Sequence, residues 1–172
     1  MRSPDNISIR RLEPTDCETI ASAFEAQGWS KPVQLFQRYL KECSVGKRDV
    51  LIADLSNEFA GYVTIDWQPD YPTFKESSIS EIVDLNVLIR SQRRGIGTRL
   101  MATAEQLISE KSDRVGIRVG LTADYGNAHR LYVDRGYVPD GRGISYREKF
   151  LKYGDTAIVD DDLTLGFIRP LK

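Results

Sequence analysis

The stretch Gln92-Arg93-Arg94-Gly95-Ile96-Gly97 decides how this chain folds. It follows an apolar run, Ile79 to Ile89, that predicts a central strand, and it opens a segment with apolar residues at helical spacing. A strand that turns through glycines into a helix leaves several backbone N–H groups pointing outward. With the positive end of the helix and the neighbouring arginines, these donors predict a binding site for a pyrophosphate. An ordinary turn with solvated arginines is the alternative.

Two better-known phosphate loops do not fit these residues. A dinucleotide-binding fingerprint needs a third glycine at position 100, where this chain has Leu100. The loop of nucleoside triphosphatases ends in Gly-Lys-Ser/Thr, a sequence that this chain lacks. Both of these nucleotide-binding classes are therefore excluded.

The Gln-x-x-Gly-x-Gly pattern after an Ile/Val-rich strand resembles the acetyl-CoA-binding motif of the GNAT acetyltransferase superfamily. Glu81 to Val87 resembles the family's central strand, and Ala128 to Tyr137 resembles its late helix with the Gly-aromatic step that ends it. These matches span about residues 79–140. The resemblance implies an α/β fold with one mixed sheet and helices on both faces, and a single domain over residues 1–172.

The resemblance also implies which residues hold acetyl-CoA, the expected co-substrate. Backbone N–H groups of the central strand would pair with the pantetheine arm, and one of them would polarise the thioester carbonyl. The loop and the first helical turn would hold the phosphates. The residues concerned are Leu85, Asn86 and Val87 in the strand, and Gln92, Arg93, Arg94, Gly95, Ile96, Gly97 and Thr98 in the loop and helix.

Two residues are candidates for proton transfer. Tyr132, in the Leu-Tyr step of the late helix, is the predicted general acid for the departing thiolate, although its apolar neighbours also suit a core tyrosine. Glu81 is the predicted base, and Asp84 is its rival. Regular strand alternation puts positions 81 and 84 on opposite faces, so only one of them can face the cleft. Solvated charges at the edge of the sheet are the alternative for both.

The chain departs from the family pattern at two positions. Many members carry an asparagine seven positions before the tyrosine, where this chain has Tyr125, and Asn127 follows two residues later. Asn127 either contacts the cofactor or caps the late helix, and its residue type favours capping. Arg93 stands where many members have glycine, so its side chain must point away from the phosphates or reach around to bind them.

The rest of the chain predicts further elements. Expected strands are 7–11, 50–55, 59–67, 115–121 and 163–168, and expected helices begin near Pro14-Thr15-Asp16 and Pro32. Residues 68–78 predict a loop and residues 137–146 a glycine-rich connection. Asp66, near the end of its strand, is a candidate partner for a substrate ammonium.

Composition narrows the function. The 24 Lys and Arg residues nearly balance 25 Asp and Glu residues, so the chain is a poor candidate for nucleic-acid binding. No apolar run predicts a membrane span or a signal peptide, and two distant cysteines, Cys17 and Cys43, fit a reducing cytoplasm. The Asp160-Asp161-Asp162 run predicts a solvated turn, and no metal site is expected.

The main hypothesis is an acetyl-CoA-dependent N-acetyltransferase. The resemblance implies direct transfer to a primary amine in a ternary complex, with a small molecule, a peptide or a protein as acceptor. A non-catalytic acyl-CoA-binding sensor with the same fold is the first alternative, and a plain interaction domain the second. We expect a monomer or a homodimer.

Overall fold

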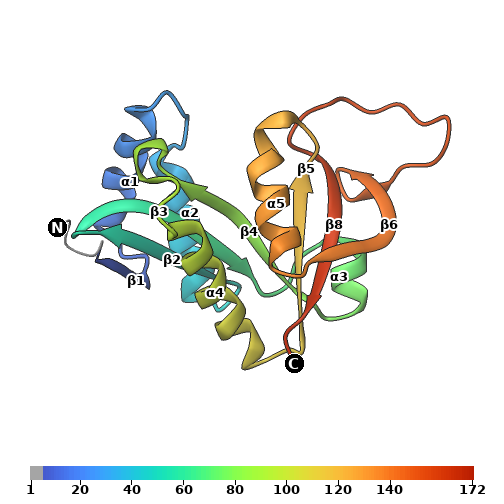
Figure 1. Ribbon diagram of the computed structural model, residues 1–172, viewed down its shortest axis with the longest axis horizontal. Coiled ribbons are helices and arrows are strands. Elements are labelled where there is room, and N and C mark those ends of the chain that lie inside the picture. Colours follow the sequence, from blue (N-terminus) through green and yellow to red (C-terminus); the bar gives the residue numbers. More distant parts are fainter. Residues whose placement is uncertain (1–5) are drawn as a thin grey trace. The chain divides into compact units, whose positions relative to one another are not determined.

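The computed structural model describes residues 6–172, so residues 1–5 of the expected domain lie outside the described residues. Figure 1 labels the elements. The described strands are β1 (Ile7–Arg11), β2 (Arg48–Leu55), β3 (Glu58–Asp66), β4 (Ser80–Val87), β5 (Arg114–Gly120), β6 (Val138–Tyr146), β7 (Lys149–Phe150) and β8 (Leu163–Pro170). The α-helices are α1 (Asp16–Glu25), α2 (Val33–Ser44), α3 (Pro72–Glu76), α4 (Ile96–Ser109) and α5 (Gly126–Asp134).

The strands form one eight-stranded sheet in the order β1-β2-β3-β4-β5-β8-β6-β7. β4 pairs with β5 in parallel, whereas β1–β2, β2–β3, β5–β8, β6–β7 and β6–β8 are antiparallel pairs, so the sheet is mixed, as expected. The chain groups into two compact units, one with residues up to Trp67 and Val83–Leu107, the other with Gln68–Ile82 and Ile108–Lys172. β4 contributes to both units. We describe each unit in turn.

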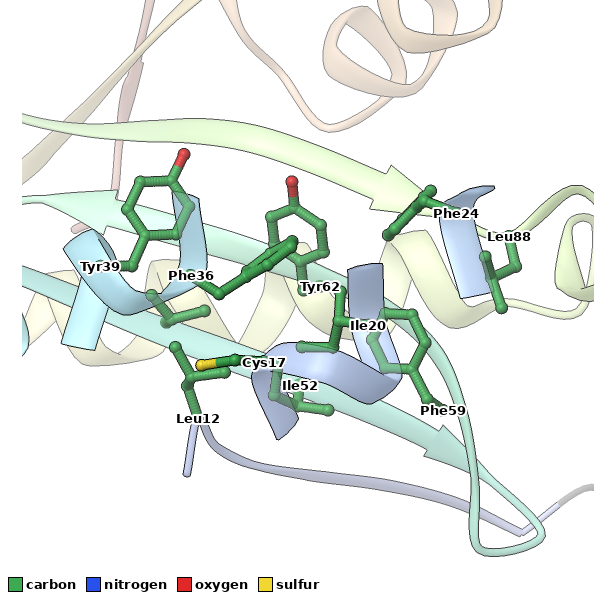
Figure 2. Packing of buried hydrophobic residues seen from close by; sticks show 11 residues of the cluster. Leu12, Cys17, Ile20, Phe24, Phe36, Tyr39, Ile52, Phe59, Tyr62 and Leu88 are labelled. Atoms are coloured by element: carbon green, nitrogen blue, oxygen red, sulfur yellow. The ribbon is translucent and has the colours of Figure 1, made fainter. Parts of the chain in front are cut away.

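The first unit contains β1 to β3, the second half of β4, and helices α1 and α2. The β2–β3 hairpin turns through Ser56 and Asn57, both at positive φ, as a tight two-residue turn requires. Helices α1 and α2 bury their apolar faces against β2 and β3 in one cluster, with Phe24, Phe36 and Tyr62 in edge-to-face contact (Figure 2). In Figure 1, α4 crosses in front of these strands and α1 and α2 lie behind them.

The second unit contains the start of β4, strands β5 to β8, and helices α3 and α5. β4 pairs with β5 only from Ser80 to Ile82, and β8 lies antiparallel between β5 and β6. A small cluster of Tyr71, Phe74 and Ile79 supports the start of β4. A Cβ atom on Gly116 would lie 2.5 Å from the Phe74 ring, so a glycine is needed for this close packing.

Two predictions of secondary structure were wrong. Residues 68–78, predicted as a loop, contain the short helix α3, which begins at Pro72 and buries Phe74. Residues 137–146, predicted as a glycine-rich connection, form β6, which pairs with β8 on both sides of an irregularity between Pro139 and Ile144. Pairing with β8 overrides the poor strand propensity of glycine here. The other predicted elements are confirmed within two residues or so at their ends.

Candidate functional site

The predicted phosphate-binding loop joins β4 to α4 in the first unit. The Gln92 side chain donates to the Val87 carbonyl at 3.2 Å, which ties the loop to the end of β4. Ile96, at the start of α4, is only 1 % exposed and anchors the helix, whereas Gln92, Arg93, Arg94 and Gly95 are exposed. The loop therefore has fixed ends and presents its middle to solvent.

Two residues of this loop adopt left-handed backbone conformations. Gly95 has φ +81° and Arg93 has φ +58°. Glycine takes such a conformation freely, whereas another residue pays about 1–2 kcal/mol. A Cβ atom on Gly95 would have nothing within 4 Å, so its backbone conformation, and not crowding within the protein, requires glycine.

The start of α4 has the geometry of an anion-binding site. The first helical hydrogen bond runs from the Arg99 N–H to the Gly95 carbonyl at 3.0 Å. The N–H groups from Gly95 to Thr98 therefore precede the first turn and have no acceptor within the helix. The helix has 14 residues, so its dipole adds positive potential at this end. The open space at Gly95, the donors and the exposed Arg93 together fit a diphosphate.

The predicted pantetheine strand, from Leu85 to Val87, lies in the first unit beyond the part of β4 that pairs with β5. It follows a break in regular strand geometry, because Asp84 has φ +58°. The Thr64 hydroxyl donates to the Val83 carbonyl at 3.1 Å just before this break. Regular strand alternation is therefore broken at Asp84, so alternation alone does not decide which of positions 81 and 84 faces the cleft.

Asp84, the rival base, is surrounded by donors. Its carboxylate accepts hydrogen bonds from Lys31, Asn86, Tyr39 and Tyr62 at 2.6–2.8 Å. Burial by itself would raise the pKa of Asp84, but the positive charge of Lys31 and these hydrogen bonds lower the pKa below its ordinary value. Asp84 is therefore held as a carboxylate whose two oxygens each accept two bonds.

Glu81, the predicted base, lies in the second unit and is 2 % exposed. Arg118 of β5 binds it with both ends of its guanidinium, Nε to Oε1 at 2.8 Å and Nη2 to Oε2 at 3.3 Å. Arg118 also donates to Glu148 at 2.8 Å. Burial lowers the pKa of Arg118, but the charge of Glu81 and the hydrogen bonds outweigh burial and raise it. The pair favours the ionised form of Glu81.

Tyr132, the predicted acid, lies on α5 in the second unit and is 6 % exposed. Its ring lies 5.9 Å from that of Tyr137, and among residues 6–172 its hydroxyl has no hydrogen-bond partner. Burial, followed by the neighbouring Tyr125, raises the pKa of Tyr132, so its phenol is neutral at physiological pH. A neutral phenol suits a residue that donates a hydrogen bond to a ligand.

Asn127 does not cap α5, so that expectation was wrong. The helix begins at Gly126 after a single 3-10 turn. Tyr125 is its N-cap residue and makes no capping bond with its side chain, and Asn127 is exposed in the first turn. Tyr125 has a different role from the asparagine of many relatives. Its ring packs on Gly120, where a Cβ would lie 2.4 Å away, and its hydroxyl donates to Asp161 at 2.9 Å.

Sequence reasoning missed several residues of the site. Arg118 is a charged residue in the otherwise apolar run 115–121, which is the one signal that could have pointed to it. Nothing in the sequence connects Lys31, Tyr39 and Tyr62 with Asp84. Asp66, a candidate partner for a substrate ammonium, pairs with Arg48 at 3.3 Å instead. Among residues 6–172 no group of His, Cys, Asp and Glu is arranged to hold a metal ion.

Comparison with known proteins gives a family for these features. A family model described as the Acetyltransferase (GNAT) family matches residues 15–137, well over half of the chain. Among curated proteins no match was found.

Solved structures with the same fold are numerous. An N-acetyltransferase from Staphylococcus aureus Mu50 is 14 % identical, with 97 % of this chain and 99 % of that chain covered and a TM-score of 0.69. The ribosomal-protein-alanine N-acetyltransferase of Brucella melitensis is 16 % identical, with 95 % and 99 % covered and a TM-score of 0.68. A Salmonella typhimurium protein, assigned as an acetyltransferase and solved with its cofactor acetyl-CoA, is 15 % identical, with 97 % and 95 % covered and a TM-score of 0.67. At these identities the likeness concerns the fold alone.

Proposed function

The chain belongs to the acetyltransferase (GNAT) family, and we propose that it transfers an acetyl group from acetyl-CoA directly to a primary amine. The transfer takes place in a ternary complex, within a single catalytic domain over residues 1–172. The observation that carries this proposal is the start of α4, where Gly95 at φ +81° and the first-turn N–H groups form a site for a diphosphate.

The loop and the strand before it would hold the co-substrate. Residues 92–98 supply backbone donors, the side chain of Gln92 and the charges of Arg93 and Arg94. Leu85, Asn86 and Val87 supply backbone groups to the pantetheine arm, which is consistent with a β4–β5 register that ends at Ile82. Asn127, exposed in the first turn of α5, is a further candidate contact. Acetyl-CoA, when bound, supplies an activated acetyl thioester.

The transfer makes three chemical demands on the protein. The amine must be neutral to attack, the thioester oxygen must be stabilised as it gains negative charge, and the departing sulfur needs a proton or a hydrogen bond. A backbone N–H between Leu85 and Val87 meets the second demand. No covalent enzyme intermediate is needed, so no nucleophilic cysteine is required.

Tyr132 meets the third demand. Its raised pKa keeps the phenol protonated, so it is always able to donate. The same raised pKa makes Tyr132 a weaker acid than a free phenol, whose pKa is about 10, while a thiol has a pKa of about 8.5. Full proton transfer in the ground state is therefore unfavourable, and Tyr132 acts chiefly by a hydrogen bond that strengthens as charge develops on sulfur.

Glu81 is the proposed base, directly or through a water molecule. It is preferred to Asp84 because all four acceptor positions of the Asp84 carboxylate are engaged. The bidentate bond from Arg118 fixes the position of the Glu81 carboxylate, which would accept the proton as the amine acquires positive charge during attack.

The acceptor is an amine of a small molecule, a peptide or a protein. The Brucella relative acts, by its name, on an alanine of a ribosomal protein, which supports an amine acceptor in general. We propose that the protein works in the cytoplasm, which its two free cysteines suit. We further propose a monomer or a homodimer. None of the helices in residues 6–172 is long and apolar enough to cross a membrane.

A non-catalytic acyl-CoA sensor is the second candidate. The buried Tyr132 and the tightly paired Glu81 favour it, because neither side chain is freely mobile. A sensor would bind acetyl-CoA without releasing CoA in the presence of any amine.

The test is a calorimetric titration with acetyl-CoA of the wild-type protein and of Gly95→Glu. We expect saturable binding that Gly95→Glu abolishes. Gly46→Glu is the matched control, because Gly46 also has a positive φ, +70°, with nothing within 4 Å of its Cβ position. No binding by the wild-type protein contradicts both candidates. Binding without CoA release across a panel of amines favours the sensor.

A further inference from the structure

A buried cluster around Asp84 has the composition of an ammonium-binding site. The Lys31 Nζ lies 2.7 Å from Asp84 Oδ1 and 5.8 Å from the centre of the Tyr62 ring. The hydroxyls of Tyr39 and Tyr62 donate to Asp84 Oδ2 at 2.8 and 2.6 Å. A carboxylate beside an aromatic face is the arrangement that proteins use to bind alkylammonium groups.

Residues other than Lys31 also hold the Asp84 carboxylate in place. Tyr62 comes from β3, Tyr39 from α2 and Asp84 from β4, and both tyrosine rings are packed into the core cluster. Figure 2 shows the two hydroxyls pointing to the same side, away from the apolar side chains of the cluster. Asn86 also donates to Asp84 Oδ1 at 2.7 Å. Tyr39, Tyr62 and Asn86 therefore surround the one negative charge of Asp84 with donors from a helix and two strands.

Lys31, by contrast, comes from the segment between α1 and α2. Its side chain is 21 % exposed, so part of it reaches solvent. The same segment holds Gln27, whose Nε2 is buried without a hydrogen-bond partner among residues 6–172. Gln27 Oε1 accepts from the Ile89 N–H at 3.0 Å. A segment that leaves a buried donor unsatisfied is not optimally seated, so its displacement is less costly than that of a helix or strand.

We propose that Asp84, Tyr39 and Tyr62 form a recognition site for an alkylammonium group, which Lys31 fills in the free protein and a cationic group of the acceptor takes over. The second part rests on the proposed function. A carboxylate with four donors stabilises an ammonium in its charged form, and a charged amine cannot attack a thioester. The group held here is therefore not the one that reacts. The acceptor carries a second alkylammonium group, as a diamine does.

The binding site is tested first without any reference to catalysis. Lys31→Ala leaves the Asp84 charge buried and without a cation, so we expect the Tm to fall by about 5 °C or more. n-Propylammonium should restore most of this loss in a saturable manner, and n-propanol should not. The double variant Lys31→Ala/Asp84→Asn should gain nothing from n-propylammonium. Lys47→Ala, at an exposed lysine in the same unit, is the control for loss of positive charge.

If Lys31→Ala does not fold, Lys31→Ser replaces it, because serine leaves the same space open. A folded Lys31→Ala or Lys31→Ser protein that n-propylammonium does not stabilise overturns the proposal, because Lys31 and Asp84 are then only a structural ion pair.

The acceptor is tested by kinetics. We expect the wild-type enzyme to prefer 1,4-diaminobutane to n-butylamine at least tenfold in kcat/KM, and Asp84→Asn to remove this preference. Asparagine tolerates the left-handed backbone at position 84, so this variant is the mildest available. Lys31→Ala should lower the KM for the diamine, because the built-in competitor is gone. An unchanged ratio in Asp84→Asn overturns the proposal.

The two proposals fail in different ways. A protein that binds no acetyl-CoA contradicts the proposed function, whereas the n-propylammonium measurement still decides the ammonium site.

Discussion

Glu81 Oε1 lies 2.8 Å from Nε of Arg118, and the second guanidinium bond, from Nη2 to Oε2, measures 3.3 Å. The two residues stand on neighbouring parallel strands, β4 and β5. Arg118 also lies over the Tyr71 ring at 5.1 Å, so its position is fixed from several sides. The predicted base is therefore part of an ion pair that links β4 to β5.

Glu81→Gln is the test of this residue as a base. We expect the rate of acetyl transfer to fall by about 10²–10⁴ and the acidic limb of the pH–rate profile to disappear, because a base must be deprotonated to act. The variant should also be less stable, because the positive charge of Arg118 then has only Glu148 as its negative partner. An unchanged rate and acidic limb would show that Glu81 is only a structural partner of Arg118.

Arg118→Lys separates the two roles of the pair. Lysine keeps the positive charge but loses the bidentate geometry, so we expect a lower Tm with an acidic limb that is still present. Activity that disappears in Arg118→Lys while acetyl-CoA binding is retained would mean that Arg118 itself takes part in the reaction.

Tyr132→Phe is expected to lower the rate by about 10²-fold or more and to leave the free energy of unfolding within about 1 kcal/mol of the wild type. The reason for the small stability change is that the hydroxyl has no partner among residues 6–172 and phenylalanine keeps the ring. Steady-state kinetics and thermal unfolding measure the two effects.

The pH dependence gives an independent check on Tyr132. An acid must be protonated, and the pKa of Tyr132 is raised by burial, so activity should not fall through its ionisation below about pH 10. If the rate of the wild-type enzyme fell above about pH 8 and Tyr132→Phe removed this fall, Tyr132 would ionise near pH 8, which would contradict its raised pKa.

Asp84 makes stability depend on pH in the acid range. Its folded pKa is lowered, so its contribution is fully present above the unfolded pKa of about 3.9 and is lost as pH falls through the lower folded pKa. We expect wild-type stability to drop below about pH 4. Asp84→Asn should be less stable at neutral pH and should lose part of this acid dependence. Urea unfolding at several pH values measures the free energy of unfolding as a function of pH. The same dependence on pH in both proteins would be evidence against this role of Asp84.

Arg93→Gly decides how this arginine acts. Glycine relieves the strain of the left-handed backbone at φ +58°, which stabilises the folded state. Glycine also gives the unfolded chain more freedom, which destabilises the folded state. Because the two effects oppose each other, we expect the free energy of unfolding to change by less than about 1 kcal/mol. Acetyl-CoA affinity should fall about three- to tenfold, with a weaker dependence on salt, if the guanidinium binds the phosphates. Arg147→Gly, at a second arginine with positive φ, is the matched control. Equal affinities before and after Arg93→Gly would mean that the side chain points away.

The local part of this fold could be predicted from the sequence. The strand, glycine turn and helix around Gly95 depend on neighbours within a few residues, and Ser56-Asn57 marks the β2–β3 hairpin for the same reason. β6 could not be predicted, because its glycines disfavour a strand and only pairing with β8 compensates for this. The left-handed backbone of Asp84 could not be predicted either, because the surrounding residues suit a regular strand.

The sequence by itself determined the strand, glycine turn and helix around Gly95, the α/β class and the family, since each depends on residue type and short-range spacing. Only the tertiary structure decided the environment of the ionisable residues. Arg118 meets Glu81 from 37 positions away, and Lys31 meets Asp84 from 53 positions away. The chemistry of a carboxylate is set by the charges and donors within a few ångströms of it, and folding brings these together from distant parts of the chain.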